Sequence, residues 1–376
     1  MTKPPLINSH RIGASTALLS PVTGAIVLTN EFGRRIHEGL QAGLNTDQIA
    51  GQIADTPQDR KDALQAVRTV LSSWEQAGLL QQDTPDFPDP VTFAPVEGNP
   101  LRFGGTKGAG QVTVPHETLA EQLETILGHM RALPGQPTTN LTSQPSAGGF
   151  AIFKERVALS GRISLDAARF VIVREMAEIV CGSADVAAVF HAGCVSQNGQ
   201  ALMICGDSGQ GKSTLTFGLV AAGCDYLGDD HIPLHCDGRS ALSFPTAAGV
   251  KPGSWGLPEI SALQTQYGLT PLSPRQGVRY IPLHQASAPA VGEKRAIAAV
   301  VFPHFHPEAE FEMTRLSPEQ ALIQALKAGS RLSQSHKSNL APLCNFLNDV
   351  PAYTLQYSSS DQSVPACLNL LSSPKT

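Results

Sequence analysis

A glycine-rich motif of eight residues restricts the folds that this chain can adopt. Residues 206–213 read Gly-Asp-Ser-Gly-Gln-Gly-Lys-Ser, which matches the phosphate-loop pattern G-x-x-x-x-G-K-[ST] at every required position. An apolar run at 201–205 predicts a strand before the motif, and residues 214–222 predict a helix that ends at Gly223. This order of strand, glycine turn and helix predicts an α/β fold built around the loop.

The loop has the chemistry to hold a nucleotide together with a metal ion. Glycines allow backbone N–H groups to close around phosphate oxygens, and the helix N-terminus adds the positive end of a dipole. Lys212 is expected to reach the β- and γ-phosphates, and the Ser213 hydroxyl is expected to bind Mg²⁺. The residues expected to bind the nucleotide are Gly206, Asp207, Ser208, Gly209, Gln210, Gly211, Lys212, Ser213 and Thr214.

Two adjacent carboxylates follow the next predicted strand. Residues 224–228 predict a short strand, and Asp229 and Asp230 stand at its end. In phosphoryl transfer one acid typically holds the metal ion, and another orients or deprotonates the attacking group. A solvated Asp-Asp turn is the alternative interpretation, because turns favour aspartate. The position of the pair after a phosphate loop favours the catalytic interpretation.

A predicted hairpin leads into the loop and carries a histidine. Residues 186–194 predict a strand, residues 197–200 predict a tight turn of the Asn-Gly type, and the partner strand begins at Ala201. This hairpin would carry His191 toward the nucleotide region. A half-buried histidine whose hydrogen bonds are satisfied is the alternative interpretation of His191.

Taken in order, these motifs resemble the catalytic core of HPr kinase/phosphorylase and related serine kinases. The resemblance rests on His191-Ala-Gly, the Asn-Gly hairpin, GDSGQGKS, the helix after it and the Gly-Asp-Asp at 228–230. It implies an α/β P-loop kinase domain of the HPr kinase type, a mixed sheet with flanking helices, over residues 101–376. The nucleotide core would lie at about 184–260. The implied activity is phosphotransfer that depends on ATP and Mg²⁺.

The resemblance also implies a role for each matching residue. The implied catalytic residues are Asp229 as the base for a serine hydroxyl, Lys212 on the phosphates and His191 lining the site, with Ser213 and Asp230 as metal ligands. The bifunctional members of the family carry glutamate where this chain has Thr214. This departure argues against the reverse, phosphorolysis reaction.

Residues 12–80 predict a small winged-helix-like α+β module. Short strands at 17–19 and 25–28 flank a turn. Three helices should follow: one capped by Asn30, one opened by Thr46 and one that starts at Pro57 and ends at Gly78. Apolar residues in each helix recur at helical spacing and predict a common core.

This module resembles the PqqD family of peptide-binding domains. The matching segments are GAIVL, NEFGRRIHEGL, TDQIAGQIA and the final WEQAGLL. The resemblance implies a domain at 1–85 and a peptide or small-protein partner bound by residues 12–80, added as a strand beside the sheet. A DNA-reading winged helix and a dimerisation module are the alternatives. DNA reading is disfavoured because acidic residues offset the basic residues of the third helix.

The remaining segments are predicted from local pattern. Residues 86–100 form a proline-rich linker, 118–133 a helix, 134–149 a loop, 150–159 a strand and 165–180 a helix capped by Ser164. A strand at 296–302 and a helix opened by a Ser317 capping box follow. Lys251, Arg275 and Arg279 are candidate contacts to phosphate or substrate, and the sequence leaves their roles open.

Composition limits the partners. The net charge of −5 and the absence of any basic run disfavour nucleic acid. No apolar stretch reaches membrane-spanning length, so we expect no membrane contact and a cytoplasmic location.

The seven cysteines form no C-x-x-C pair and are expected to be buried free thiols, without support for a disulfide or a zinc site. His304 and His306 alternate without a third ligand nearby and are weak metal candidates. A homo-oligomer is possible, as in related kinases.

Both resemblances together imply an ATP-dependent serine or threonine kinase that modifies a peptide held by its N-terminal module. Two other functions stay open. One is a nucleotide-gated peptide carrier that hydrolyses or only binds ATP. The other is a small-molecule P-loop kinase in which the N-terminal module is regulatory.

Overall fold

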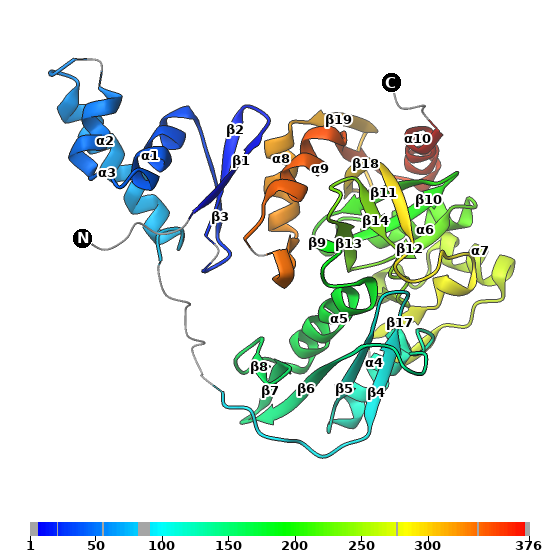
Figure 1. The fold of residues 1–376 in the computed structure, drawn as a ribbon. Helices are drawn as coiled ribbons and strands as arrows, with labels where there is room; N and C mark the ends of the chain where they lie inside the picture. Colours follow the sequence, from blue (N-terminus) through cyan, green and yellow to red (C-terminus); the bar gives the residue numbers. More distant parts are fainter. Residues whose placement is uncertain are drawn as a thin grey trace.

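The computed structural model describes residues 7–20, 22–54, 56–81, 91–275, 277–336 and 338–372. Residues 82–90, which include the first part of the linker predicted at 86–100, and the side chain of Arg275 lie outside the described part. The fold is mixed α/β with several sheets (Figure 1). An N-terminal sheet with three helices faces α8 and α9, a large sheet occupies the centre, and a third sheet lies on the far side of α5.

Residues 7–81 form a three-stranded antiparallel sheet with helices on one side. The elements are β1 (Asn8–Ile12), β2 (Ser15–Leu19), β3 (Ile26–Thr29), α1 (Glu31–Gln41), α2 (Thr46–Ile53) and α3 (Arg60–Gln76), in the sheet order β1-β2-β3. Asn30 caps α1 as predicted, since its side chain accepts a hydrogen bond from Gly33 N. The cap of α2 is Asn45, not Thr46, because Asn45 forms a reciprocal capping box with Gln48. Helix α3 begins at Arg60, after a turn that follows Pro57.

A five-stranded sheet of order β4-β5-β6-β7-β8 comes next. Its strands are β4 (Pro100–Gly104), β5 (Ala109–Thr113), β6 (Thr138–Ser146), β7 (Gly149–Lys154) and β8 (Val157–Ala158). The same part of the chain contains the helices α4 (Glu117–Leu127) and α5 (Leu165–Cys181). The loop predicted at 134–149 is wrong, because most of that segment is β6. Pairing with β5 on one side and β7 on the other overrides its polar, proline-containing composition.

The described end of the predicted linker is tied to this sheet. Ala94 N donates to Gln144 Oε1 at 2.7 Å, and Gln144 Nε2 donates to Thr92 O at 3.1 Å. Phe93 packs edge-on against Phe153 with ring centroids 5.4 Å apart. Residue 100, the predicted end of the linker, already belongs to β4.

The central ten-stranded sheet carries the phosphate loop. Its path is β12-β10-β11-β18-β14-β13-β9-β20, with β21 paired to β18 and β19 paired to β21. The strands are β9 (Val186–Phe190), β10 (Ala192–Gln197), β11 (Gln200–Cys205), β12 (Asp225–Gly228), β13 (Ile232–His235), β14 (Ser240–Leu242), β18 (Lys294–Phe305), β19 (Glu312–Leu316), β20 (Arg331–Leu332) and β21 (Ala352–Tyr357). Strand β18 lies beside β11, so the sheet around the loop extends well past the predicted core at 184–260.

The remaining elements surround this sheet. The helices are α6 (Lys212–Ala221), α7 (Pro258–Tyr267), α8 (Pro318–Lys327), α9 (Ala341–Asp349) and α10 (Ser360–Ser372), with the 3-10 turns η1 (Pro252–Ser254), η2 (Leu283–Gln285) and η3 (Gln334–His336). A small sheet of order β15-β17-β16 is formed by β15 (Ala248–Val250), β16 (Leu272–Arg275) and β17 (Val278–Ile281).

The predicted strand at 186–194 is two strands, which corrects the hairpin prediction in part. The Asn-Gly hairpin is present as β10 and β11, but β9 leaves it and pairs with β13 and β20. His191 stands at the break between β9 and β10. The chain must change its place in the sheet there, so His191 belongs to a crossover point and not to the hairpin.

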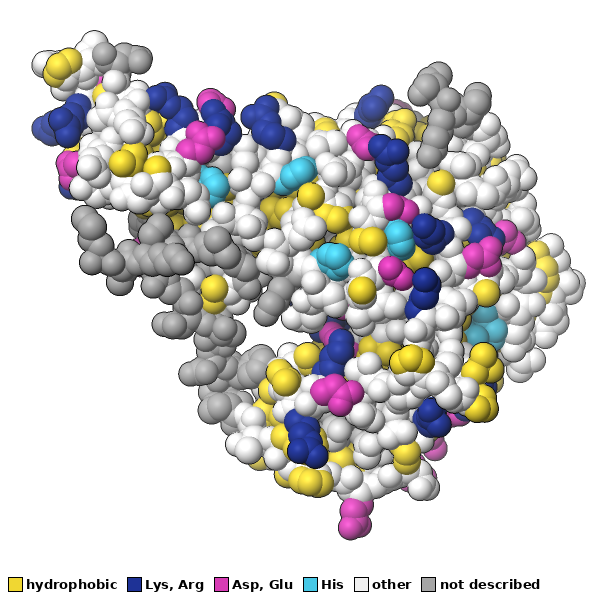
Figure 2. All heavy atoms as spheres, viewed as in Figure 1, with side chains coloured by type: hydrophobic (Ala, Val, Ile, Leu, Met, Phe, Trp, Pro, Cys, Tyr) yellow, Lys and Arg dark blue, Asp and Glu magenta, His cyan; other side chains and the backbone are white. Residues whose placement is uncertain are grey.

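The N-terminal sheet packs on the rest of the chain. Ile12, Ala17 and Leu19 share one buried apolar cluster with α8, α9 and the central sheet, whereas Leu18 belongs to the separate core of the N-terminal helices. Basic and acidic side chains are interspersed over the face shown in Figure 2. Within the described residues, no helix combines the length and apolarity needed to cross a bilayer.

Candidate active site

The phosphate loop connects β11 to α6, as the motif predicts. Gly209 and Gly211 have φ angles of 90° and 94°, values that L side chains rarely adopt. A methyl group at Gly211 would also collide with the Tyr357 hydroxyl, which donates to Gly211 O at 3.2 Å. The loop therefore needs glycine at residue 211 for both backbone angle and space, and β21 supplies the wall against which it closes.

Lys212 is buried within a cluster of charges. Its side chain is 6% exposed, and its Nζ lies 2.9 Å from Asp230 Oδ1, 4.0 Å from Asp229 Oδ1 and 3.4 Å from His191 Nε2. Burial lowers the pKa of Lys212, but the charges of Asp230 and Asp229 outweigh burial and raise it above the usual value. The ammonium group is thus held in its charged form at the loop.

The two neighbouring aspartates have different surroundings. Asp229 is 3% exposed, its Oδ2 accepts a hydrogen bond from Ser213 Oγ at 3.1 Å, and its Oδ1 is buried without a hydrogen-bond partner. The side chain of Asp230 is 47% exposed and its φ is 66°. Burial and the charge of Asp230 raise the pKa of Asp229. Partial burial acts against the charge of Asp230, but Lys212 outweighs it and lowers the Asp230 pKa.

Two histidines stand beside the carboxylates. His191 Nε2 lies 3.7 Å from Asp230 Oδ1, and the His191 backbone N donates to Ser330 Oγ at 3.2 Å. Burial and the nearby Lys212 charge lower the pKa of His191, so its ring is neutral at pH 7. His231 is 5% exposed and packs on Phe170, and burial lowers its pKa to about 3. Both rings therefore act as uncharged groups.

Small residues bring these elements together. Gly193 on β10 faces α6, where a methyl group would collide with Thr216 Oγ1 and lie 3.4 Å from Asp229 Oδ1. Gly228 has a φ of 155° and packs on Phe244. Helix α6 and Asp229 can approach β10 this closely only because Gly193 has no side chain.

A pocket of about 670 Å³ opens in front of the cluster. One wall contains the phosphate loop, the aspartates and His191. The other wall comes from α4, α5 and the segment from β15 to β17, and includes Arg169, Phe170 and Tyr280. Lys251 reaches across and donates to Ser208 Oγ on the loop. The volume suits a nucleotide-sized or larger ligand.

The structure brings most of the predicted site residues to this pocket. Those that line it are Asp207, Ser208, Gly209, Gly211, Lys212, Ser213, Thr214, Asp229, Asp230, His191 and Lys251. Gly206 and Gln210 belong to the same loop without lining the cavity, and the exposed Arg279 stacks over Trp255 at 4.2 Å. His304 Nδ1 lies 3.3 Å from Gln210 Oε1, next to the loop.

Sequence reasoning missed several pocket residues. Arg169, Phe170, Tyr357 and the serines at 358–360 reach the pocket from α5 and from the end of β21. They carry no local motif and are brought to the loop only by sheet order. His231 could have been suspected from its place next to the aspartate pair.

Comparisons with known proteins add little to this geometry. No family model and no curated protein matches the chain. Thirty-two chains of solved structures match it. Among them is the HPr(Ser) kinase/phosphatase from Coxiella burnetii, which aligns over 48% of this chain and 91% of its own, with 11% identity and a TM-score of 0.23.

Proposed function

We propose that this chain is an ATP- and Mg²⁺-dependent phosphotransferase that phosphorylates a hydroxyl group of a peptide or small protein. The observation that carries the proposal is the shared pocket in which a phosphate loop, its lysine and two carboxylates face one another. Phosphoryl transfer needs positioned positive charge on the phosphates, a metal ligand and a group that receives the hydroxyl proton. Lys212, Ser213 and the aspartate pair supply these in one place.

We assign the aspartate roles in the opposite order to the order that the motif resemblance implies. Asp229 is buried against the Ser213 hydroxyl, the group that a phosphate loop offers to Mg²⁺, so it suits the metal. Asp230 is half exposed at the pocket and close to His191, so it can reach an incoming hydroxyl. Its low pKa is compatible with this role, because the proton leaves late in a loose transition state.

Lys212 would change partners when a nucleotide binds. In the structure its ammonium group pairs with Asp230 at 2.9 Å. Phosphate oxygens would draw Lys212 away, and Asp230 would then be free to accept a hydrogen bond from the acceptor hydroxyl. The ring of His191 is neutral and lies 3.7 Å from Asp230 Oδ1, so it adds no second positive charge that would compete for this carboxylate.

The N-terminal module offers one open backbone edge for a peptide. Strand β1 contacts α9, and Asn348 Nδ2 donates to Arg11 O at 3.1 Å. Strand β3 pairs with β2 on one side and with no other described strand. We propose that the peptide adds beside β3, where main-chain hydrogen bonds give affinity and side-chain pockets give specificity.

The proposal is tested by incubating the purified chain with γ-labelled ATP, Mg²⁺ and peptides encoded beside its gene. Label on a peptide hydroxyl supports the kinase. Release of free phosphate alone would support a nucleotide-gated carrier, and label on a metabolite would support a small-molecule kinase.

Two variants separate the roles of the aspartates. Asp230→Asn should lower transfer at least a hundredfold while nucleotide affinity stays within about threefold, because general-base loss typically costs 10²–10⁴ in rate. Asp229→Asn should instead raise the Mg²⁺ concentration needed for half-maximal transfer. If Asp230→Asn retains transfer and Asp229→Asn abolishes it at saturating Mg²⁺, the base is Asp229.

A further inference from the structure

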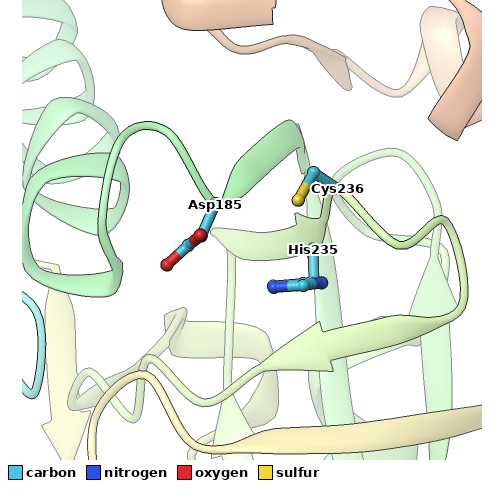
Figure 3. Close-up of side chains that lie close together, drawn as sticks. All are labelled: Asp185, His235 and Cys236. Carbon is cyan, nitrogen blue, oxygen red and sulfur yellow. The ribbon is translucent and has the colours of Figure 1, made fainter.

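A second group of ligand-type side chains lies outside the active site. Asp185, His235 and Cys236 each offer one ligand atom, and these atoms all lie within 4.8 Å of one another (Figure 3). The three residues are partly buried. Asp185 precedes β9, and the other two end β13 and begin the turn after it. The three residues of this cluster take no part in the proposed phosphotransfer.

The backbone holds the two segments at a fixed spacing. Cys236 N donates to Asp185 O at 2.8 Å, and His235 pairs with Val186 across the two strands. The register shifts between Leu234 and His235, which marks a β-bulge at the cluster. Side chains of consecutive strand residues normally point to opposite faces. The bulge and the turn that begins at Cys236 allow His235 and Cys236 to approach the same carboxylate.

The surroundings of His235 suit a metal ligand. Its Nδ1 lies 2.9 Å from Asp237 Oδ2, and that carboxylate also accepts hydrogen bonds from Arg239 N and Ser240 Oγ. Asp237 N also donates toward Nδ1 at 3.1 Å, so the amide and the carboxylate of Asp237 compete for this nitrogen. When Nδ1 carries the proton and donates to Asp237 Oδ2, the Nε2 lone pair is available for a metal. Metal-binding histidines typically present such a carboxylate on the other ring nitrogen, which fixes the tautomer and the ring orientation.

We propose that Asp185, His235 and Cys236 form a zinc site, with water as the fourth ligand. One carboxylate oxygen, one imidazole nitrogen and one thiolate are all ligands that Zn²⁺ accepts, and their softness favours Zn²⁺ over Mg²⁺ or Ca²⁺. Binding displaces the thiol proton of Cys236 into solvent. Cys236 is only partly buried, whereas the other six cysteines are buried, so its thiol is the accessible one.

Two lysines lie beside the site, and their positive charges disfavour the binding of a cation. Lys107 Nζ lies 3.4 Å from Asp185 Oδ2, and Lys294 Nζ lies 3.7 Å from Asp237 Oδ2. Both side chains are more than half exposed, so either can turn into solvent when a cation binds. Lys107 therefore weakens the site without blocking it, and its removal should strengthen metal binding.

The site would fasten the strand pair that carries the active-site residues. Strands β9 and β13 are antiparallel, with His235 beside Val186 at one end and Ile232 beside Phe190 at the other. At the other end of the pair, His191 follows β9 and Asp230 precedes β13. This end lies roughly 13 Å from the cluster, at 3.3 Å per residue. A metal at the near end would fix the register of this pair, and so the separation of His191 from Asp230.

The test uses the full chain, freed of metal with a chelator, in excess Mg²⁺ with ATP so that the phosphate loop is occupied. Titration with Co²⁺ should give one ion per chain and a thiolate-to-metal absorption band, and Zn²⁺ should abolish the band and raise the melting temperature.

Cys236→Ala should remove the band and lower Zn²⁺ affinity at least tenfold, whereas Cys224→Ala should leave both unchanged. Asp185→Asn should weaken Zn²⁺ binding and Lys107→Met should strengthen it. A wild-type chain without the band, or a band that survives Cys236→Ala, overturns the site, as does Zn²⁺ binding that Asp185→Asn leaves unchanged.

Discussion

At the scale of single residues, Gly209 and Gly211 allow backbone strain and close packing to be told apart. Both have positive φ angles, but a methyl group at Gly209 would meet open space, whereas one at Gly211 would meet Tyr357. An alanine residue held at a left-handed φ angle lowers the free energy of unfolding by about 1–2 kcal/mol, even where its methyl group meets no other atom. Gly209→Ala should therefore lower stability by about that amount, and Gly211→Ala by clearly more.

Thermal melting and nucleotide titration of the two variants check this. Tyr357→Phe removes the hydroxyl that a methyl group at Gly211 would meet, so adding it to Gly211→Ala should restore part of the lost stability. Equal effects of the two alanine variants would show that only the backbone angle matters at the loop.

His231 predicts a pH dependence of stability. Burial lowers its pKa to about 3 in the folded chain, whereas an unfolded histidine has a pKa near 6.5. Between these values the unfolded chain binds more protons, so acidification from about pH 6.5 toward 3 destabilises the fold. The contribution is at most about 1.4 kcal/mol per pH unit for one proton.

The check is a comparison of melting temperatures at pH 7 and pH 5. The melting temperature of the wild type should fall more on acidification than that of His231→Gln, because glutamine has no group that titrates in this range. His306→Gln, at an exposed position, serves as the control and should behave like wild type. An unchanged pH response in His231→Gln would show that the ring is not held neutral.

At the scale of elements, α8 joins the N-terminal sheet to the His191 segment. Glu319 in its first turn accepts hydrogen bonds from Ala14 N at 2.6 Å and Ser15 N at 3.2 Å. Just past its last turn, Ser330 Oγ accepts the hydrogen bond from His191 N. The segment from Glu319 in α8 to Ser330 after it thus contacts both the turn between β1 and β2 and the backbone of His191.

Glu319→Ala should loosen the turn between β1 and β2, since two backbone N–H groups lose their acceptor. Hydrogen exchange at Ala14 and Ser15 should become faster by roughly tenfold, which corresponds to about 1.4 kcal/mol and is typical of hydrogen bonds to charged groups. Glu319→Gln keeps an acceptor oxygen and should change exchange less. Exchange that is identical in Glu319→Ala and wild type would mean that α8 does not hold this turn.

The elements also show which parts of the fold could be predicted from sequence. Caps are local, so Asn30, Ser164 and Ser317 placed the starts of their helices correctly. The phosphate loop was equally predictable because its flanks are adjacent in sequence. Strand β6 was missed because its neighbours β5 and β7, and not its own composition, hold it extended. The strand break at His191 was missed for a similar reason, since pairing with β13 depends on distant residues.

The same reasoning explains what was predictable in the sites. Lys212, Ser213 and the aspartate pair lie within nineteen residues, so one motif located them. Phe170 and Tyr357 reach the pocket from segments that lie far apart in the sequence, on either side of the motif. Asp185 and Cys236 are about fifty residues apart and match no metal-binding spacing, which is why the cysteine pattern gave no indication of a metal site.

At the scale of the whole molecule, β2 belongs to two cores at once. Leu18 points into the core of the N-terminal helices, and its neighbour Leu19 points into the cluster shared with α9 and the central sheet. Both are fully buried. Unfolding the N-terminal sheet would expose the shared cluster, so residues 7–81 and the rest of the chain should unfold together.

The two tryptophans of the chain can report on this, because Trp74 is buried in the N-terminal module and Trp255 lies beside the pocket. Trp255→Phe leaves the first reporter and Trp74→Phe the second, and their urea transitions should coincide. Leu19→Ala, which removes about 2–5 kcal/mol from the shared cluster, should shift the Trp255 transition to lower urea. Leu18→Ala should shift the Trp74 signal at least as much as the Trp255 signal. The opposite result is a Trp74 transition in the Trp255→Phe variant at clearly lower urea than the Trp255 transition in the Trp74→Phe variant. In that case the shared cluster does not couple the two parts, and the N-terminal module unfolds as an independent unit.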